Sequence, residues 1–287
     1  MHVFFDGDGI INRYINDYDQ YITIYTLDFF NNIISSSNFD SENNEISRSI
    51  LKLESEGIPL TDVSSRMVSN RFDSTKILIG GNGGLMSIDL TTKDINPIFQ
   101  DLGAILPVAY GSRQDVDSFY FCVSSNKISD LSQNMHQFDQ DVVDIIISDY
   151  DSNHILVLCV NSVHRGLDGT HDLININGLH DFSGRSFIQG AIVHMYDQQT
   201  AAAGSFAKHI FDECYIVSTN RDIYISKSIG GAGDPPVKWK SITGSLPNVY
   251  ITSFVYDTED DILLVGTRGR GVWKLDALSR IISDLIS

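Results

Sequence analysis

Short apolar segments joined by glycine-containing turns recur along this chain. The clearest copy is Ile262–Asp276, in which the apolar run Ile-Leu-Leu-Val precedes the turn Gly-Thr-Arg-Gly-Arg-Gly and a second run that alternates apolar and polar residues. Alternation with a period of two is typical of a half-buried β-strand, and glycine reaches the positive φ angles that tight hairpin turns require. Each copy therefore predicts two antiparallel strands joined by a turn.

Five further copies of this pattern are spread along the chain. They are His2–Tyr14, Ile77–Leu90, Phe119–Ser129, Cys214–Ser226 and the weaker His154–Ile176, with its turn expected at Val163–Leu167. Repetition on this scale indicates an array of β units, and propeller blades run about 40–50 residues each. We therefore expect successive copies to be successive blades.

Additional apolar segments extend each copy to four strands. Candidates for a first strand are Arg66–Phe72, Val142–Asp149 and Tyr250–Asp257, and candidates for a fourth strand are Ile98–Leu102 and Trp239–Ile242. A chain of 287 residues is long enough for one large all-β domain. The sequence thus predicts an all-β fold, a single β-propeller domain over residues 1–287 with about six four-stranded blades.

Specific core positions follow from this alignment. Ile79, Val123, Val217 and Val265 stand at the same place ahead of the polar turns, so we expect them at equivalent positions in second strands. Aromatic residues fill large spaces between packed sheets. We accordingly expect Trp239 and Trp273 to pack between blades, with Trp273 mostly buried.

Two segments carry helical rather than strand spacing. Ile46, Ile50 and Leu53 predict a helical insertion over residues 41–57, with Ser41 as its cap and Gly57 as its stop. The end of the chain is also amphipathic at helical spacing, which predicts a short C-terminal helix over 278–287.

The first copy has no strand ahead of it. Two explanations remain open: a strand from the other terminus closes the propeller, or the chain is a fragment of a longer one. The N-terminal stretch lacks the basic start and long apolar run of a signal peptide, and no apolar run reaches the ~18 residues of a membrane span, so we expect neither.

The charge of the chain limits the classes of partner that we expect, and its cysteine content indicates the state of its thiols. Asp and Glu number 37 against 20 Lys and Arg, a net charge of −17. Such a surface repels nucleic acid phosphates and anionic lipid, which argues against both as partners, and the lack of a long apolar run argues against membrane insertion. Cys122, Cys159 and Cys214 all fall in predicted strands, and an odd, sparse set of this kind predicts buried free thiols.

The region 222–276 resembles the Asp-box (BNR) repeat propellers, which include sialidases and sortilin-type domains. The family's box is Ser-x-Asp-x-Gly-x-Thr-Trp; Ser226 and Gly230 match it, Ser228 replaces its Asp, and extra residues precede Trp239. The resemblance implies a propeller fold and permits an extracellular location. It also raises sialidase chemistry, which needs three arginines, a Tyr–Glu pair and an acidic group, but no motif identifies catalytic residues and the family's Arg-Ile-Pro signature is absent.

The glycine-rich turns are also similar to those of sensor propellers attached to two-component regulators. A further alternative comes from Asp6-Gly7-Asp8-Gly9 after an apolar run, which is typical of haloacid-dehalogenase-type phosphatases. That chemistry requires an α/β fold, whereas this chain predicts short strands, so we favour a β-turn. His164, His171 and His180 are spaced irregularly for metal ligands, and we expect neither metal nor cofactor.

Basic residues gather in the predicted turns between second and third strands. They are Lys127, Arg165, Arg221, Arg268 and Arg270. In a propeller these turns share one face around the central channel, so a cationic ring on an acidic protein would focus an anionic ligand. The leading hypothesis is a non-enzymatic binding or scaffold module for an anionic glycan or acidic peptide; a sialidase-like glycoside hydrolase and a sensor propeller are the alternatives.

Overall fold

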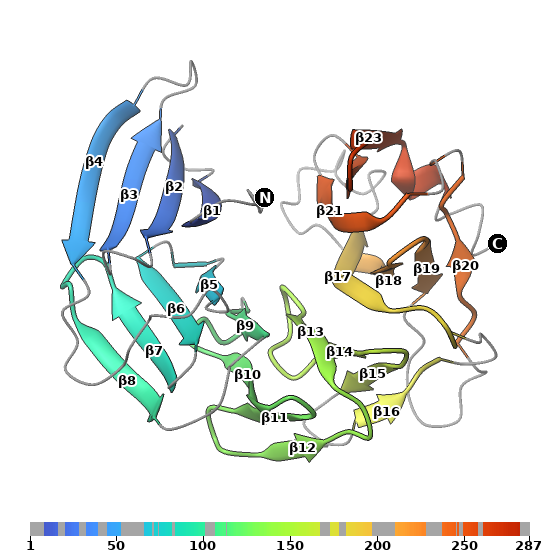
Figure 1. The fold of residues 1–287 in the computed structure, drawn as a ribbon, viewed down its shortest axis with the longest axis horizontal. Helices are drawn as coiled ribbons and strands as arrows, with labels where there is room; N and C mark the ends of the chain where they lie inside the picture. The colour runs from blue at the N-terminus through green and yellow to red at the C-terminus, as the bar shows by residue number, and fades with distance from the viewer. Residues whose placement is uncertain are drawn as a thin grey trace. The chain divides into compact units, whose positions relative to one another are not determined.

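The regular secondary structure of the described residues is almost entirely β-strand. The computed structural model describes residues 9–16, 21–28, 33–39, 45–52, 66–70, 72–73, 75–81, 84–100, 107–112, 114–166, 173–177, 182–196, 210–227, 237–244, 246, 249–257 and 261–281. The chain forms two compact units, Met1–Val142 with Asp149–Ser152 and Val143–Ser148 with Asn153–Ser287. In both, antiparallel strands join their neighbours in chain order (Figure 1).

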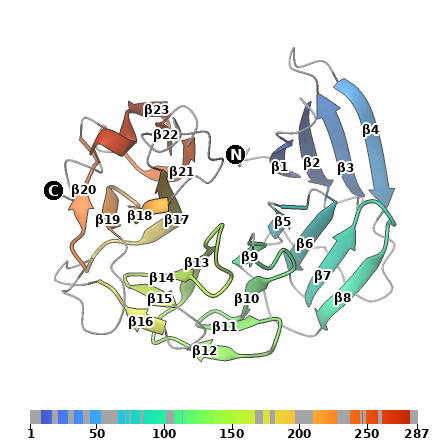
Figure 2. The ribbon, with the colours of Figure 1, turned by 180° about the vertical axis from the view of Figure 1, so that it is seen from behind.

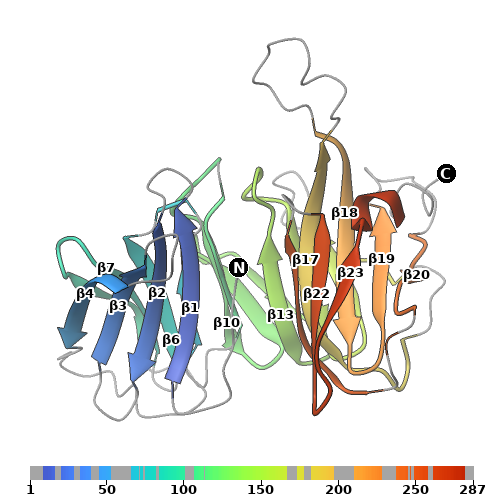
Figure 3. The same ribbon diagram turned by 90° about the horizontal axis from the view of Figure 1, so that it is seen from above.

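In the part of the first unit that the structure describes, the strands form three four-stranded sheets. The first has β1 (Gly9–Asn16), β2 (Tyr21–Asp28), β3 (Ile33–Phe39) and β4 (Glu45–Lys52), which lie side by side in Figure 3. The second has β5 (Arg66–Ser69), β6 (Lys76–Gly81), β7 (Gly84–Asp89) and β8 (Ile95–Gln100), and the third has β9 (Val108–Tyr110), β10 (Phe119–Ser124), β11 (Lys127–Asp130) and β12 (Met135–Gln137). Apolar side chains such as Leu78, Leu85 and Phe121 pack between the second and third sheets.

The second unit continues the pattern. Its sheets are β13 (Val142–Ile147), β14 (Ile155–Cys159), β15 (Val163–Gly166) and β16 (Leu173–Asn175); β17 (Phe187–Tyr196), β18 (Ile210–Thr219), β19 (Ile223–Lys227) and β20 (Lys240–Ser241); and β21 (Ile251–Asp257), β22 (Ile262–Thr267) and β23 (Gly271–Asp276) (Figure 2). Val142, the first residue of β13, is assigned to the first unit. One core cluster joins the first two of these sheets and another joins the last two.

Among the described residues, six meandering sheets, five of four strands and one of three, confirm the predicted all-β fold of about six four-stranded blades. The predicted hairpins Ile77–Leu90, Phe119–Ser129, Cys214–Ser226 and Ile262–Asp276 correspond to β6–β7, β10–β11, β18–β19 and β22–β23. All four expected core residues lie in second strands. Ile79, Val217 and Val265 are buried, whereas Val123 is half-buried at the point where the register of β10 against β11 shifts.

The helix predicted over residues 41–57 is wrong, because β4 occupies Glu45–Lys52 and pairs antiparallel with β3. Ile46 and Ile50 are four residues apart, and four is a multiple of the strand period as well as close to one helical turn. The spacing therefore did not distinguish the two structures. The β-branched isoleucines fit a strand better.

The His2–Tyr14 copy was also misassigned. Gly9–Tyr14 lies within β1, the first strand of its sheet, rather than in a second-to-third-strand hairpin. Asp6 and Asp8 lie outside the described residues. At the other end, residues 278–281 form a helical turn, and the remainder of the predicted 278–287 helix is not described.

The cysteine prediction is confirmed, since Cys122, Cys159 and Cys214 are free and buried. The two tryptophans differ. Trp239 is buried, and its indole Nε1 donates a 2.9 Å hydrogen bond to the Ile176 carbonyl. Trp273 remains 37 % exposed, so the prediction that it is mostly buried is wrong.

Candidate functional site

Four of the five predicted basic residues lie at turns between second and third strands. Lys127 is the first residue of β11, Arg221 lies in the β18–β19 turn, and Arg268 and Arg270 lie in the β22–β23 turn. Lys127 belongs to the first unit and the three arginines to the second. The arginines are exposed, whereas Lys127 is half-buried.

Arg165 does not belong to this group. It lies inside β15, where it pairs with Leu156 of β14 and Ile174 of β16, and it is only 5 % exposed. The β14–β15 turn falls at residues 160–162, earlier than the expected Val163–Leu167. Arg165 is therefore a core residue and is excluded from the candidate site.

Backbone hydrogen bonds hold the turns of the second unit in a continuous series. The Phe187 amide donates to the Val160 carbonyl, and the Asn220 amide donates to the Ser186 carbonyl. The β18–β19 turn, which contains Asn220, is therefore bonded to the residue directly before β17, the first strand of the same sheet.

The same pattern repeats one sheet further on. The Ile251 amide donates to the Asn220 carbonyl at 3.2 Å, and the Arg268 amide donates to the Tyr250 carbonyl at 2.8 Å. Because Tyr250 and Ile251 are adjacent, these two bonds bring the Arg221 turn next to the turn that carries Arg268 and Arg270.

The geometry of each arginine turn is set locally. Thr219 Oγ1 accepts hydrogen bonds from the amides of Arg221 and Asp222 at 3.3 and 3.1 Å. In the other turn, Gly269 and Gly271 have φ angles of 78° and 74°, a region that non-glycine side chains rarely adopt. These constraints fix the backbone and leave the arginine side chains pointing to solvent.

We call Arg221, Tyr250, Arg268, Arg270 and Trp273 the cationic turn surface. Within the described part of the chain, no carboxylate lies within ion-pair distance of its three guanidinium groups. Tyr250 is 45 % exposed and Trp273 37 % exposed, so two aromatic rings accompany the charges. A ligand that carries both carboxylate or sulfate groups and an apolar surface suits exposed guanidinium groups and exposed aromatic rings on the same turns and strand.

The carboxylate closest in sequence to these arginines is already engaged. Asp222 Oδ2 lies 2.7 Å from Arg185 Nη1, and Asp222 Oδ1 accepts a hydrogen bond from Thr243 Oγ1 at 3.3 Å. Burial, followed by the nearby Asp222 charge, raises the pKa of Tyr224, whose hydroxyl reaches Asp222 at 3.5 Å. Asp222 is therefore engaged by Arg185, and no described carboxylate pairs with Arg221.

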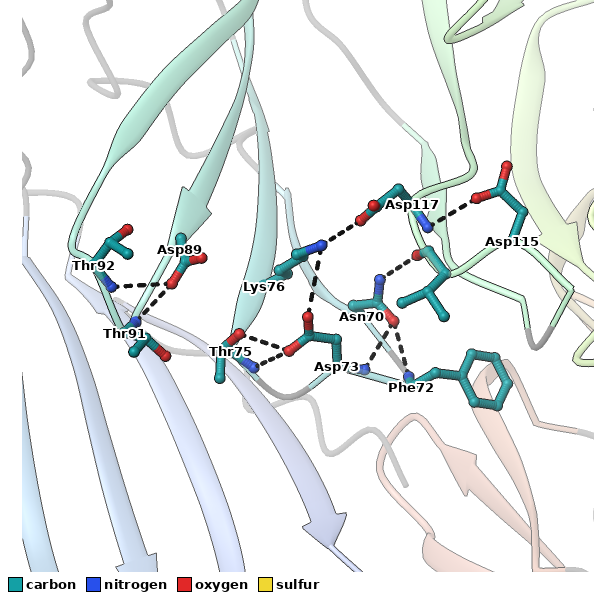
Figure 4. A network of polar contacts seen from close by, with 11 residues as sticks. Asn70, Phe72, Asp73, Thr75, Lys76, Asp89, Thr91, Thr92, Asp115 and Asp117 are labelled. Atoms are coloured by element: carbon teal, nitrogen blue, oxygen red, sulfur yellow. Dashed lines mark hydrogen bonds and ion pairs between the residues drawn. The ribbon is translucent and has the colours of Figure 1, made fainter.

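A second polar network lies in the first unit, between the β5–β6 and β9–β10 loops (Figure 4). Asn70 is fully buried; its Oδ1 accepts hydrogen bonds from the amides of Phe72 and Asp73, and its Nδ2 donates to the Val116 carbonyl. Lys76 bridges Asp73 and Asp117. These hydrogen bonds and ion pairs connect loops of two neighbouring sheets, so the network has a structural role.

Ionisation in this network is coupled to folding. Partial burial of Asp73 works against its charge, but hydrogen bonds from Thr75 and the charge of Lys76 hold the pKa of Asp73 below its ordinary value. The hydrogen bond to Asp117 raises the pKa of Lys76. Both charged forms are thus favoured in the native state.

Two residues, one in the cationic turn surface and one beside it, were not anticipated from sequence. Tyr250 was assigned to a first strand, although it lies just before β21 and exposes its ring. Its place directly after a Leu-Pro-Asn-Val loop was the available signal, because residues between a loop and a strand often remain at the surface. Arg185 lies between the predicted segments, so no hydrophobic period or turn motif pointed to its role.

Among the described residues, no group of three or more His, Cys, Asp and Glu side chains is placed to hold a metal ion. Among these same residues there is also no helix with the length and apolar character to cross a bilayer.

Neither a family model nor a curated protein sequence matches this chain. The Asp-box resemblance therefore stays a prediction, and residues 228–236, which carry part of it, are not described.

Solved structures do resemble it. An auxiliary nutrient binding protein from Bacteroides thetaiotaomicron superimposes with a TM-score of 0.52 at 12 % identity, over 96 % of this chain and 74 % of that one. The extracellular domain of a putative hybrid two-component system from the same organism gives 0.57 at 16 % identity, over 96 % of this chain and 33 % of that one. BBS1N in complex with ARL6DN gives 0.50 at 10 % identity, over 92 % and 89 %. At such identities the likeness shows the fold alone, and that fold is the β-propeller.

Proposed function

We propose that this protein is a non-enzymatic binding module that holds an anionic ligand on the cationic turn surface. The supporting observation is the set of three exposed arginines, Arg221, Arg268 and Arg270, on two turns bonded through Tyr250 and Ile251. The ligand class is an acidic peptide or a carboxylated or sulfated glycan.

The charge balance of the chain strengthens this proposal. The net charge is −17, so most of the surface repels anions. A local group of uncompensated arginines is then the place where an anionic ligand gains the most electrostatic free energy. Because these charges are exposed, the attraction falls as salt screens it.

The test compares two triple variants with the same net charge. Arg221→Ala/Arg268→Ala/Arg270→Ala removes the cationic turn surface, whereas Lys93→Ala/Lys238→Ala/Lys240→Ala removes three exposed lysines elsewhere. Binding of a labelled heparin hexasaccharide and of hexaglutamate is measured by fluorescence anisotropy at low and high salt. We expect the arginine variant to bind roughly tenfold or more weakly and to lose its salt dependence, and the lysine variant to bind as the parent does. Equal losses in both variants would refute a localised site.

A sensor role is the second candidate. One structural neighbour is described as the extracellular domain of a two-component system, and the glycine-rich turns of this chain resemble those of sensor propellers. A sensor uses the same binding step, followed by a response in an attached domain. A sialidase-like activity remains the enzymatic alternative, and hydrolysis of a fluorogenic sialoside by the parent protein would establish it.

A further inference from the structure

Among the residues that the structure describes, β23 forms the outer edge of the last sheet of the second unit. β23 pairs with β22 through six consecutive residue pairs, from Ile262↔Asp276 to Thr267↔Gly271, without a register shift. No fourth strand borders β23 among the described residues. In an antiparallel strand, alternate residues direct their amide and carbonyl groups to each side. Every second residue of β23 therefore directs its amide and carbonyl groups to this edge, where no strand of the described residues pairs with them.

Length and regularity distinguish β23 from the other outer strands of this unit. β16 has three residues and β20 has two. Short edge strands are poor templates for further pairing, and proteins use them to prevent it. β23 has six residues, no proline and no bulge. Among the described outer strands of the second unit, β23 is therefore the one long enough to pair with another strand.

The side chains of β23 provide contacts on both faces of such a strand. Trp273 pairs with Val265, so it lies on the face that packs into the core, and it remains 37 % exposed. Val272 lies on the opposite face and is 70 % exposed. Cross-strand neighbours on one face are the stabilising contacts of a sheet. An apolar side chain beside Trp273 would cover part of its exposed ring.

The charges at this edge specify the partner. Arg268 and Arg270 immediately precede β23, and no described carboxylate pairs with them. Lys274 is compensated by Asp276 at 2.8 Å. The uncompensated positive charge therefore lies at the Gly271 end of the strand.

We propose that the free edge of β23 accepts an extended acidic peptide from a partner protein as the fourth strand of the sheet. Main-chain hydrogen bonds to β23 provide affinity, an apolar peptide side chain lies beside Trp273, and a carboxylate lies beside Arg268 and Arg270. This inference rests on the proposed function, because it assigns the anionic ligand of the cationic turn surface to one chemical class.

The first experiment uses labelled peptides. The probe is Glu-Val-Glu-Val-Glu-Val, compared with Lys-Val-Lys-Val-Lys-Val and with the Glu-Val peptide N-methylated at every residue. We expect the lysine peptide to bind roughly tenfold or more weakly, and the N-methylated peptide not to bind, because it lacks amide donors. Binding that survives N-methylation would overturn strand addition.

Hydrogen exchange of the β23 amides gives an independent readout. In the free protein, alternate amides between Val272 and Asp276 should exchange fast, and the Glu-Val peptide should slow them. Slow exchange of all of these amides in the free protein would show that the edge is already covered by this chain, and would overturn the proposal.

Two proline variants test the edge itself. Val272→Pro and Trp273→Pro remove the amide hydrogens of consecutive residues, one of which faces β22 and the other the free edge. The variant at the free edge should keep the urea midpoint of the parent and lose the peptide, while the other should lose stability. Retained peptide binding in both would contradict the proposal.

The outcomes also separate this inference from the proposed function. If heparin hexasaccharide binds the parent and depends on the three arginines, but the Glu-Val peptide does not bind, strand addition is wrong and the anion-binding function stands. If neither ligand binds, both proposals are wrong.

Discussion

Nε2 of His154 lies 2.7 Å from the hydroxyl of Tyr215, and both side chains are buried in the second unit. His154 precedes β14 and Tyr215 lies in β18, so this hydrogen bond joins two neighbouring sheets. The rings meet edge to face, with centroids 5.8 Å apart. Apolar packing dominates this core, and the pair adds a directional contact to it.

Tyr215→Phe should therefore lower the free energy of unfolding by about 1–3 kcal/mol, because it removes the hydroxyl and keeps the ring. Urea denaturation measures the change. Tyr250→Phe is the matched control, since that ring is 45 % exposed, and it should leave the midpoint within error. Equal midpoints for Tyr215→Phe and the parent would show that the hydrogen bond contributes nothing net.

Gly111→Ala should destabilise the first unit more than a positive φ alone explains. Gly111 has φ +82°, and an added Cβ would lie 2.7 Å from Asn70 Oδ1, which already accepts two amide hydrogen bonds. We expect about 1–2 kcal/mol from the backbone conformation and a further ~1–3 kcal/mol from disturbing Asn70. Gly269→Ala isolates the first cost, because Gly269 has φ +78° and open space around it. Similar denaturation midpoints for the two variants would argue against the Asn70 contact.

Trp239→Ala should cost roughly 3–5 kcal/mol, because it empties a buried site beside Phe182 and breaks the bond to Ile176. Trp273→Ala should cost much less and weaken ligand binding instead, because its ring is partly exposed at the free edge. Parallel urea denaturation and anisotropy titrations of both variants measure the two effects. The reverse ranking in stability would contradict the structure.

Acid should weaken the first unit through Asp73. Its native pKa is lowered from 3.8, so its stabilising contribution is complete above that value and is lost as the pH falls through the lowered pKa. Asp73→Asn removes this titration, and its stability should depend less on pH than the parent's between about pH 2 and pH 5. Urea denaturation at several pH values measures the slopes. Asp115→Asn is a comparison variant outside the Lys76 ion pair; an identical change in slope would point to general charge effects.

High pH should destabilise the first unit through ionisation of Tyr120. Burial, followed by the charges of Asp130 and Asp151, raises the pKa of Tyr120 to about 12. The unfolded chain ionises this phenol near its ordinary value of 10.0, so its contribution to stability is complete below that value and is lost as the pH rises towards 12. An absorbance titration should show one late-ionising tyrosine fewer in Tyr120→Phe than in the parent. An unchanged number would exclude Tyr120 as the source.

The hairpins were predictable because polar turns and glycines interrupt alternating strands, a local signal. The β14–β15 turn was misplaced because it contains Val160, Asn161 and Ser162, without glycine. Gly166, which falls within the predicted turn Val163–Leu167, is instead the last residue of β15, where a Cβ would approach Ile155 and Leu173 at 3.0 Å. Arg165 was consequently placed on a surface when it belongs to the core.

Trp273 shows a second limit of sequence patterns. Alternation correctly placed it on the face of Val265, which is buried. The exposed fraction of a side chain also depends on whether another strand covers that side of its own strand. β23 is the outermost strand described in its sheet. The position of a strand within a sheet comes from long-range pairing, which a local period does not encode.

The backbone hydrogen bonds between successive turns affect how this surface can evolve. Main-chain atoms of Ser186, Asn220, Tyr250 and Ile251 hold the turns, so the side chains of Arg221, Arg268 and Arg270 are not required to maintain the turn positions. Exchanging these side chains alters what the surface attracts while the supporting backbone stays in register. Single substitutions in these turns can therefore change which ligand the surface prefers without moving the backbone.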